Sequence, residues 1–301
     1  MMRISTFSLL LLSMLTLTPC TMQGKAIRRA DILEAMERAN THFIVSHPDP
    51  TLPTCVGRMR PSNLWTRGVY FEGLTELIRI EQQTGGSQLD RNMKYLTDWA
   101  DFHQWTPRNG VKTRDADDYC CCQTYLVFAN EDGLIPTRQC MDNLLGTPES
   151  EGDWTWIDAI QMGLPVLIQL SRIDHANGDP DFARYAEQGW RMYQWTRNTQ
   201  GGGLFNEAEG LWWRDKDFVP PYKEPNGKHC YWSRGNGWVY AALVRAMENI
   251  RGMQGYDNHL KDYEHDFRLM SEALAKCIRK DYTWNVSLHD ESNYGGKELT
   301  G

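Results

Sequence analysis

The sequence has little that would suit a nucleic-acid-binding or membrane-spanning protein. Its formal net charge is -7, and its lysines and arginines are scattered along the chain. A surface that follows phosphates needs a basic stripe. The one marked apolar run, residues 7–17, is too short to cross a bilayer. We therefore expect no nucleic-acid partner and no transmembrane segment, and any anionic substrate must be held by a local pocket.

The cysteines form neither a disulfide framework nor a zinc site. Seven of the eight follow Cys20, and three of these are consecutive at positions 120–122. The count is odd, and no C-x-x-C pair stands near paired histidines. We therefore expect no metal, and we expect residues 120–122 to be buried thiols on a packed helix.

Residues 1–24 are predicted to be a signal peptide, because Arg3 precedes an apolar run of the length of a signal-peptide core. The mature protein should then be periplasmic or extracellular. The segment Leu17-Thr-Pro-Cys20 is similar to a lipobox, in which Cys20 would carry a lipid anchor, although Pro19 is atypical there. Both the cleaved soluble form and the lipoprotein form stay open. Residues 25–301 are predicted to form one domain.

Periodicity predicts an all-α protein, with few strand signals. Turns rich in Gly or Asp recur about every 45–50 residues, which is typical of repeated helical hairpins. Such hairpins could stack as an open solenoid or close into an α/α toroid. Loops that carry Trp, Asp and Arg before the inner helices favour a toroid with a pocket at one end. The predicted helices cover residues 27–45, 65–84, 89–103, 117–130, 137–145, 164–175, 181–197, 236–252 and 259–280.

The stretch 231–248 joins polar and aromatic residues to the start of a helix. Apolar residues recur with helical spacing after Gly237, so Arg234 is predicted to lie in the loop that leads into this helix. Helix starts attract anions, and Arg234 adds a planar bidentate donor for a carboxylate. Trp232 and Trp238 flank it. The alternative is a capped core helix with packing tryptophans.

Two acidic motifs precede helices in the same way. Three acids within residues 115–118 are more than a helix cap needs, although one of them should be a cap. Asp158 follows Trp154 and Trp156 and precedes an apolar helix, with Pro165 expected in its first turn. Desolvation beside tryptophans would raise the pKa of Asp158 towards a value useful for proton donation. A capping or buried, hydrogen-bonded aspartate is the alternative.

Two acids, an arginine and several tryptophans suit a carbohydrate site. Three blocks carry a specific resemblance: W-I-D-A-x-x-M-G-L-P at 156–165, D-D-Y-x-x-x-Q-T-Y-L at 117–126, and W-S-R-G-N-G-W at 232–238. They resemble the signature blocks of glycoside hydrolase family 105, the unsaturated rhamnogalacturonyl hydrolases, with the glucuronyl hydrolases of family 88 as more distant relatives. The resemblance runs from about residue 27 to the last residue.

The resemblance implies an (α/α)6 barrel that removes a Δ4,5-unsaturated uronic acid from the non-reducing end of pectin or rhamnogalacturonan fragments. A general acid protonates C4, water adds at C5, and the hemiketal opens. Asp158 matches the acid/base, and Asp118 matches the second acid, which places water or binds sugar hydroxyls. The residues that match the holding and stacking of the uronate are Arg234, Trp232, Trp238 and Trp156. The resemblance implies no metal or organic cofactor.

We count about nine helices where a sixfold double ring needs twelve, so the ring is expected to lack its C-terminal helices. Three alternatives stay open. The chain could be a sugar-binding toroid without turnover, a glucuronyl-specific relative, or a uronate lyase with a Tyr or His base and often a metal.

Overall fold

The computed structural model describes residues 28–290 and 297–298, so the predicted signal peptide and Cys20 lie outside the described residues. The described chain is largely helical. None of its helices has the length and apolar character needed to cross a bilayer. Its α-helices are α1 (Arg29–Ser46), α2 (Trp65–Thr84), α3 (Leu89–Phe102), α4 (Ala116–Tyr119), α5 (Cys122–Phe128), α6 (Glu131–Leu145), α7 (Asp158–Ala176), α8 (Ala183–Asn198), α9 (Ser233–Ile250) and α10 (Asp257–Cys277).

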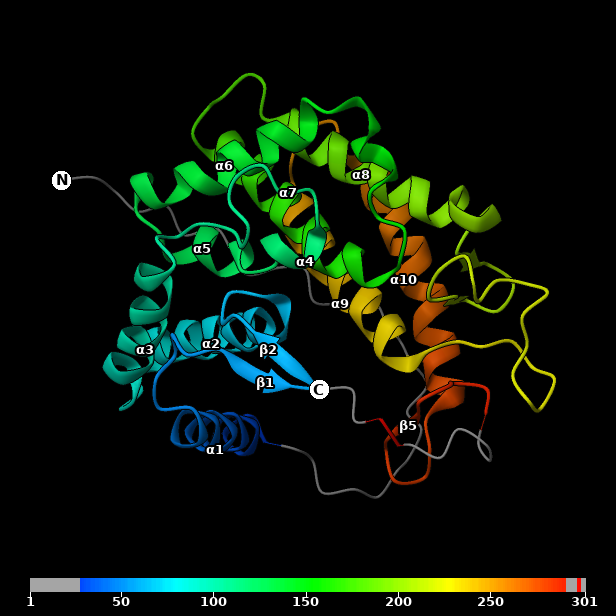
Figure 1. Ribbon diagram of the computed structural model, residues 1–301, viewed down its shortest axis with the longest axis horizontal. Coiled ribbons are helices and arrows are strands. Elements are labelled where there is room, and N and C mark those ends of the chain that lie inside the picture. Colours follow the sequence, from blue (N-terminus) through cyan, green and yellow to red (C-terminus); the bar gives the residue numbers. More distant parts are fainter. Residues whose placement is uncertain (1–27, 291–296, 299–301) are drawn as a thin grey trace.

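The helices alternate between an outer and an inner layer along the chain (Figure 1). α1, α3, α6, α8 and α10 lie on the outside, while α2, α4 with α5, α7 and α9 lie towards the middle. The inner helix α7 packs against α9 and against its outer neighbour α8. The predicted α/α toroid is thus confirmed. In the described residues it is an arc of five outer and four inner units, with α1 and α10 at its two ends.

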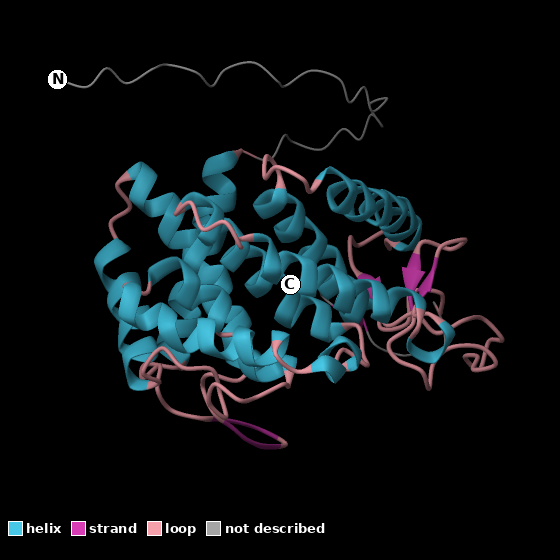
Figure 2. Ribbon diagram, turned by 90° about the horizontal axis from the view of Figure 1, so that it is seen from above, coloured by secondary structure: helices cyan, strands magenta, loops and turns pink. Residues whose placement is uncertain are grey.

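Strands are confined to three small antiparallel pairs beside the helices, as expected from the few strand signals (Figure 2). β1 (Thr54–Val56) pairs with β2 (Arg58–Arg60) just before α2. β3 (Phe205–Asn206) pairs with β4 (Leu211–Trp212), and β5 (Trp284–Asn285) pairs with β6 (Lys297–Glu298). Two short 3-10 helices, Pro148–Gly152 and Gln200–Gly202, complete the described elements.

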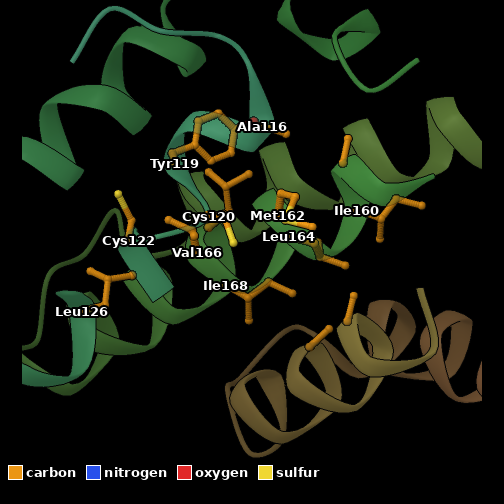
Figure 3. Packing of buried hydrophobic residues seen from close by; sticks show 14 of the residues in the cluster. Ala116, Tyr119, Cys120, Cys122, Leu126, Ile160, Met162, Leu164, Val166 and Ile168 are labelled. Carbon is orange, nitrogen blue, oxygen red and sulfur yellow. The ribbon is translucent and has the colours of Figure 1, made fainter. Parts of the chain in front are cut away.

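One part of the core lies where α4 and α5 meet the inner helix α7, and Figure 3 shows side chains of this part, among them Tyr119 and Cys120 of the α4–α5 segment and Met162 of α7. α7 is buried on nearly every side, which suits a helix that is apolar all round. Its Gly163 is needed for close packing, because an added Cβ would lie 2.4 Å from Trp154 Cζ2. The expected burial is confirmed, since residues 120–122 are fully buried free cysteines, but Cys120 and Cys121 lie in the turn between α4 and α5 and not on a helix.

Three predicted helix starts were wrong, those of α7, α6 and α9. α7 begins at Asp158 and not at residue 164, so Pro165 lies inside the helix and not in its first turn. Proline has no N–H to give to the carbonyl four residues earlier, that of Gln161. The Gln123 side chain from α5 supplies the missing donor, with Nε2 at 2.8 Å from the Gln161 oxygen. A distant residue therefore makes the proline tolerable.

The helix at 117–130 was predicted as one element, but the structure divides it into α4 and α5, and the division lies against Gly68 of α2. α6 begins at Glu131 and not at residue 137. Its start is fixed by Asn130, whose Oδ1 accepts the backbone N–H of Gly133 at 2.9 Å. Residues 131–133, which lie between two of the predicted helices, therefore form the first turn of α6.

Candidate active site

The N-terminal ends of the inner helices come together at one end of the arc. Trp65 at the start of α2 lies edge-on to Trp238 of α9, with ring centroids 6.4 Å apart. Ile157, which precedes α7, packs against Gly235 in the first turn of α9. A Cβ on Gly235 would lie 2.8 Å from Ile157 Cδ1, so a larger residue would push α7 and α9 apart. The predicted site motifs thus meet at this end.

Asp118 is buried and fully engaged by its own loop. Its Oδ1 accepts a hydrogen bond from Arg108 at 2.7 Å, and its Oδ2 accepts from Asn109 at 2.8 Å and from Thr113 at 2.6 Å. Its side chain is 1% exposed. The backbone N–H of Arg108 also donates to the Asp118 carbonyl. Asp118 therefore holds the loop 108–113 against α4 with every carboxylate oxygen occupied.

Asp117 is the acid of this motif that interacts with Asp158. The pKa of Asp117 is raised to about 7, mainly by burial and also by the nearby charges of Asp115, Asp158 and Asp118, while the charge of Arg60 acts in the opposite direction. A carboxyl that titrates near neutrality can hold or accept a proton during a reaction. The sequence pattern alone does not distinguish Asp117 from its acidic neighbours. The available signal was the surplus of acids over what a cap needs.

Asp115 is the helix cap that was predicted for this acidic motif. Its Oδ1 accepts the backbone N–H of Asp117 at 3.1 Å, which satisfies a free donor at the start of α4. The three neighbouring acids thus have three separate tasks: Asp115 caps the helix, Asp118 fixes the loop, and Asp117 interacts with Asp158.

Asp158 is the first residue of α7 and is partly exposed, so its carboxylate stands at the positive end of a long helix. The segment before it is held firmly. Ile157 donates its backbone N–H to the Arg214 carbonyl at 3.0 Å, and Trp156 forms an isolated β-bridge with Asp215. Buried Trp154 donates its indole N–H to the Tyr119 hydroxyl at 3.0 Å. The loop 211–215 therefore sets the position of Asp158.

Arg234 lies in the first turn of α9, because this helix begins at Ser233 and not at the predicted residue 236. Its side chain is exposed at the surface, and its guanidinium carbon lies 4.2 Å from the centre of the Trp232 ring, a cation–π arrangement. The backbone N–H of Ser233 donates to the Val286 carbonyl at 2.9 Å. The helix start is thus tied to the loop before the last described strand.

Asn236 in the same motif is a structural residue. It is fully buried and bonds both polar groups of the Trp212 backbone, accepting from its N–H at 2.8 Å and donating to its carbonyl at 3.0 Å. It also donates to the Trp232 carbonyl at 2.9 Å. Asn236 therefore fixes β4 and the Trp232 backbone relative to α9.

An apolar groove of about 560 Å³ adjoins Arg234 between α9 and α10. Trp238, Leu274 and Trp284 line it. The structure thus places Arg234, Trp232 and Trp238 in one neighbourhood and Asp117 and Asp158 in another, joined by the contact of Ile157 with Gly235. Among the residues that the structure describes, no three His, Cys, Asp or Glu side chains are grouped so that they could hold a metal ion.

An α/α arc whose inner helix starts carry paired acids, an arginine and tryptophans defines the class of toroidal carbohydrate-active proteins. The sequence matches Glycosyl Hydrolase Family 88 over residues 35–301, and the chain belongs to this family. The predicted resemblance to the unsaturated uronyl hydrolases is confirmed.

Two similar proteins of known name support the assignment to this family. Two curated proteins are each named "Unsaturated 3S-rhamnoglycuronyl hydrolase". The protein from Formosa agariphila is 27% identical over 260 residues, and the one from Alteromonas sp. is 25% identical over 267 residues. The aligned parts are 79% and 80% of this chain but 63% and 59% of the relatives, so the chain spans about 60% of their length.

A solved structure shows the same fold. The family 88 glycosyl hydrolase from Bacteroides vulgatus superposes with a TM-score of 0.71 at 24% identity, covering 87% of this chain and 72% of its own.

Proposed function

We propose that this protein is a glycosidase that removes a Δ4,5-unsaturated uronic acid from the non-reducing end of acidic oligosaccharides, with galacturonyl groups of pectin or rhamnogalacturonan as the first candidates. Family membership supports the reaction class. The names of the curated relatives support an unsaturated uronide substrate. The observation that carries the proposal is the packing of Ile157 against Gly235, which brings Asp158 at the start of α7 to the same end of the arc as Arg234 at the start of α9.

In the proposed reaction, Asp158 gives a proton to C4 of the C4–C5 double bond, and water adds its oxygen to C5. The proton that water loses passes to the second carboxylate. The resulting C5 hemiketal opens by breaking the C5–O5 bond, which leaves a ketone at C5 and a hemiacetal at C1. The hemiacetal then collapses to the aldehyde, which breaks the C1–O bond and releases the next sugar with its hydroxyl restored. No nucleophile displaces the leaving sugar at C1, so the separations used to distinguish retaining from inverting glycosidases do not apply.

The second carboxylate in this scheme is Asp117. The resemblance gave this role to Asp118, whose oxygens are already bound by Arg108, Asn109 and Thr113. Asp117 has a pKa raised to about 7, which suits a group that takes a proton from water near neutral pH. Asp118 then acts through the loop it fixes.

Arg234 is proposed to bind the uronate carboxylate, with the Trp232 ring beneath its guanidinium group. The stacked ring fixes the plane of the guanidinium fork, so two N–H groups can point at one carboxylate. Trp238 and Trp156 supply partly buried indole faces on which a sugar ring can stack.

The test follows the ultraviolet absorbance of the conjugated double bond in an unsaturated rhamnogalacturonan disaccharide. A hydrolase consumes this chromophore, a lyase creates it from saturated polymer, and a binding protein leaves it unchanged. Loss of absorbance with release of free rhamnose supports the proposal. A persistent chromophore in the presence of folded protein contradicts it, and tight binding without turnover would favour the sugar-binding alternative.

Export is also proposed, on the strength of residues 1–24. Mass spectrometry of the protein from its native membrane or medium would show cleavage before Cys20 with an added diacylglycerol if the lipoprotein form exists. Cys20→Ala would then release the protein from membranes. A mature chain that retains its first residues would contradict both forms.

A further inference from the structure

A small polar pocket adjoins the acid pair and has no task in the proposed reaction. Its volume is about 180 Å³, and it lies between the β1–β2 hairpin and the loops before α4. Asp117 forms part of its wall, so the pocket is next to the reacting groups. The residues that line it are Arg58, Met59, Arg60, Pro61, Leu64, Arg108, Asp115 and Asp117.

Three arginines are concentrated in this pocket, in a protein whose net charge is negative. Arg58 and Arg60 are two residues apart on β2, so their side chains leave the same face of the strand. The short antiparallel pairing with β1 fixes this register. The arrangement therefore presents two guanidinium groups together, immediately before the first turn of α2.

The charges of Arg58 and Arg60 have no close carboxylate partner within the described part of the chain, although the charge of Arg60 lowers the pKa of Asp117. Neither side chain forms an ion pair there, whereas Arg108 is bound to Asp118 at 2.7 Å. Arg60 Nε is buried and has no hydrogen-bond partner among the described residues. A buried donor without a partner is destabilising, and a ligand oxygen could supply the missing acceptor.

The two acids in the wall compensate these charges only in part. The Asp115 carboxylate accepts a backbone N–H at the start of α4. The Asp117 carboxyl has its pKa raised to about 7 and so carries about half a charge at neutral pH. The remaining field in the pocket favours an oxyanion.

We propose that Arg58 and Arg60 form a subsite for an anionic group on the sugar that follows the unsaturated uronate, either a sulfate ester or a second carboxylate. A carboxylate presents two coplanar oxygens, and a sulfate ester presents oxygens in a tetrahedral arrangement. A guanidinium group can bind either of them through two N–H donors. This inference rests on the proposed function, since the pocket is defined relative to Asp117 and Asp158. It makes β2 the element that selects among leaving sugars.

The subsite differs from the one assigned to Arg234. Arg234 lies in α9 and lines the groove towards α10, whereas Arg58 and Arg60 line the pocket on the α4 side of the acids. A substrate with the unsaturated ring at Arg234 can extend its next sugar past Asp117 towards β2. The two arginine sites then bind two different charges of one disaccharide.

The experiment compares three unsaturated disaccharides that differ only in the leaving sugar: neutral rhamnose, sulfated rhamnose and a uronic acid. Wild type should prefer the charged substrates through a lower KM. Arg58→Gln with Arg60→Gln should raise KM for them by about tenfold or more and change the neutral substrate by less than about twofold. The preference should also weaken as salt is added. A difference between the sulfated and uronic substrates identifies which oxyanion the pocket binds.

Arg251→Gln is the matched control, because Arg251 is an exposed arginine that forms an ion pair with Glu264 on the surface. It should leave all three substrates unchanged. Equal losses for charged and neutral substrates in the Arg58/Arg60 variant would overturn the proposal and indicate that these arginines hold the uronate itself. No preference in wild type would also overturn it.

Calorimetry separates this proposal from the proposed function. If no substrate is turned over, the function fails, but the same three disaccharides can still be titrated into wild type and the double variant. Selective loss of binding for the charged pair would support the subsite even then. Equal binding of all three by both proteins would reject it. Circular dichroism and the melting temperature of each variant confirm that it is folded.

Discussion

Replacing Asp117 with Asn should stabilise the protein above neutral pH while it impairs turnover. The Asp117 carboxyl is largely buried near Asp115, Asp158 and Asp118, and its pKa is raised to about 7. Ionisation is therefore costly in the folded state. Asn has a similar shape and no proton to lose, so it avoids that cost and also removes the proposed proton acceptor.

The sign and size follow from proton linkage. An unfolded aspartate has a pKa near 3.9, so between about pH 4 and pH 7 the folded chain keeps a proton that the unfolded chain has lost. The stability that Asp117 contributes is complete below about pH 4, declines as the pH rises and is gone above about pH 7. From pH 5 to pH 8 the decline is at most about 3 kcal/mol, and partial solvent access should reduce it to about 1–2 kcal/mol.

Thermal unfolding at pH 5 and pH 8 measures this difference. The gain in Tm of Asp117→Asn over wild type should be about 2–5 °C larger at pH 8 than at pH 5. Asp98→Asn is the control, because Asp98 is an exposed carboxylate paired with Lys94, and its effect should be small and equal at both pH values. A pH-independent effect of Asp117→Asn would refute the reasoning that Asp117 is desolvated and protonated near neutrality.

Three further substitutions test the site. Asp158→Asn should lower kcat by about two to three orders of magnitude while substrate still binds, and near wild-type kcat would show that the acid is misassigned. Arg234→Lys keeps the charge but loses the fork, so KM for unsaturated uronides should rise about tenfold, with neutral glycosides ignored by both forms; an unchanged KM would place the carboxylate elsewhere. Asp118→Asn leaves Arg108 without its partner, so denaturant unfolding should show a loss of about 1–3 kcal/mol. Reduced turnover with full stability would instead return Asp118 to the chemistry.

Helices with a regular apolar period could be predicted well from the sequence. The range 65–84 was predicted for α2 and is its observed extent, and the alternation of outer and inner helices follows from the repeated turns. The apolar residues of such a helix lie on the face that packs against its neighbours, so their spacing can be read directly from the sequence. Burial of the three consecutive cysteines could be expected for a different reason, because the odd cysteine count and the absence of a paired motif left neither a disulfide framework nor a zinc site for them.

Helix starts in the site could not be predicted, because tertiary contacts set them. Gly163 and Pro165 lie soon after the first turn of α7, and in the sequence alone these two residues indicate a break in the helix. Trp154 fills the space beside the glycine, and Gln123 satisfies the carbonyl that the proline leaves free. The periodic spacing of apolar residues gives no sign of either contact, that of Trp154 or that of Gln123.

The choice between Asp117 and Asp118 shows the same limit at the level of chemistry. Consecutive residues on a helix point about 100° apart, so only one of two adjacent acids can reach a given partner. Which one does so here depends on the loop 108–113, whose Arg108, Asn109 and Thr113 all bond Asp118. Once these donors hold Asp118 inward, its neighbour is left to interact with Asp158. A motif can therefore identify the pair of acids, whereas the hydrogen-bond donors of the preceding loop decide which member of the pair is free to react.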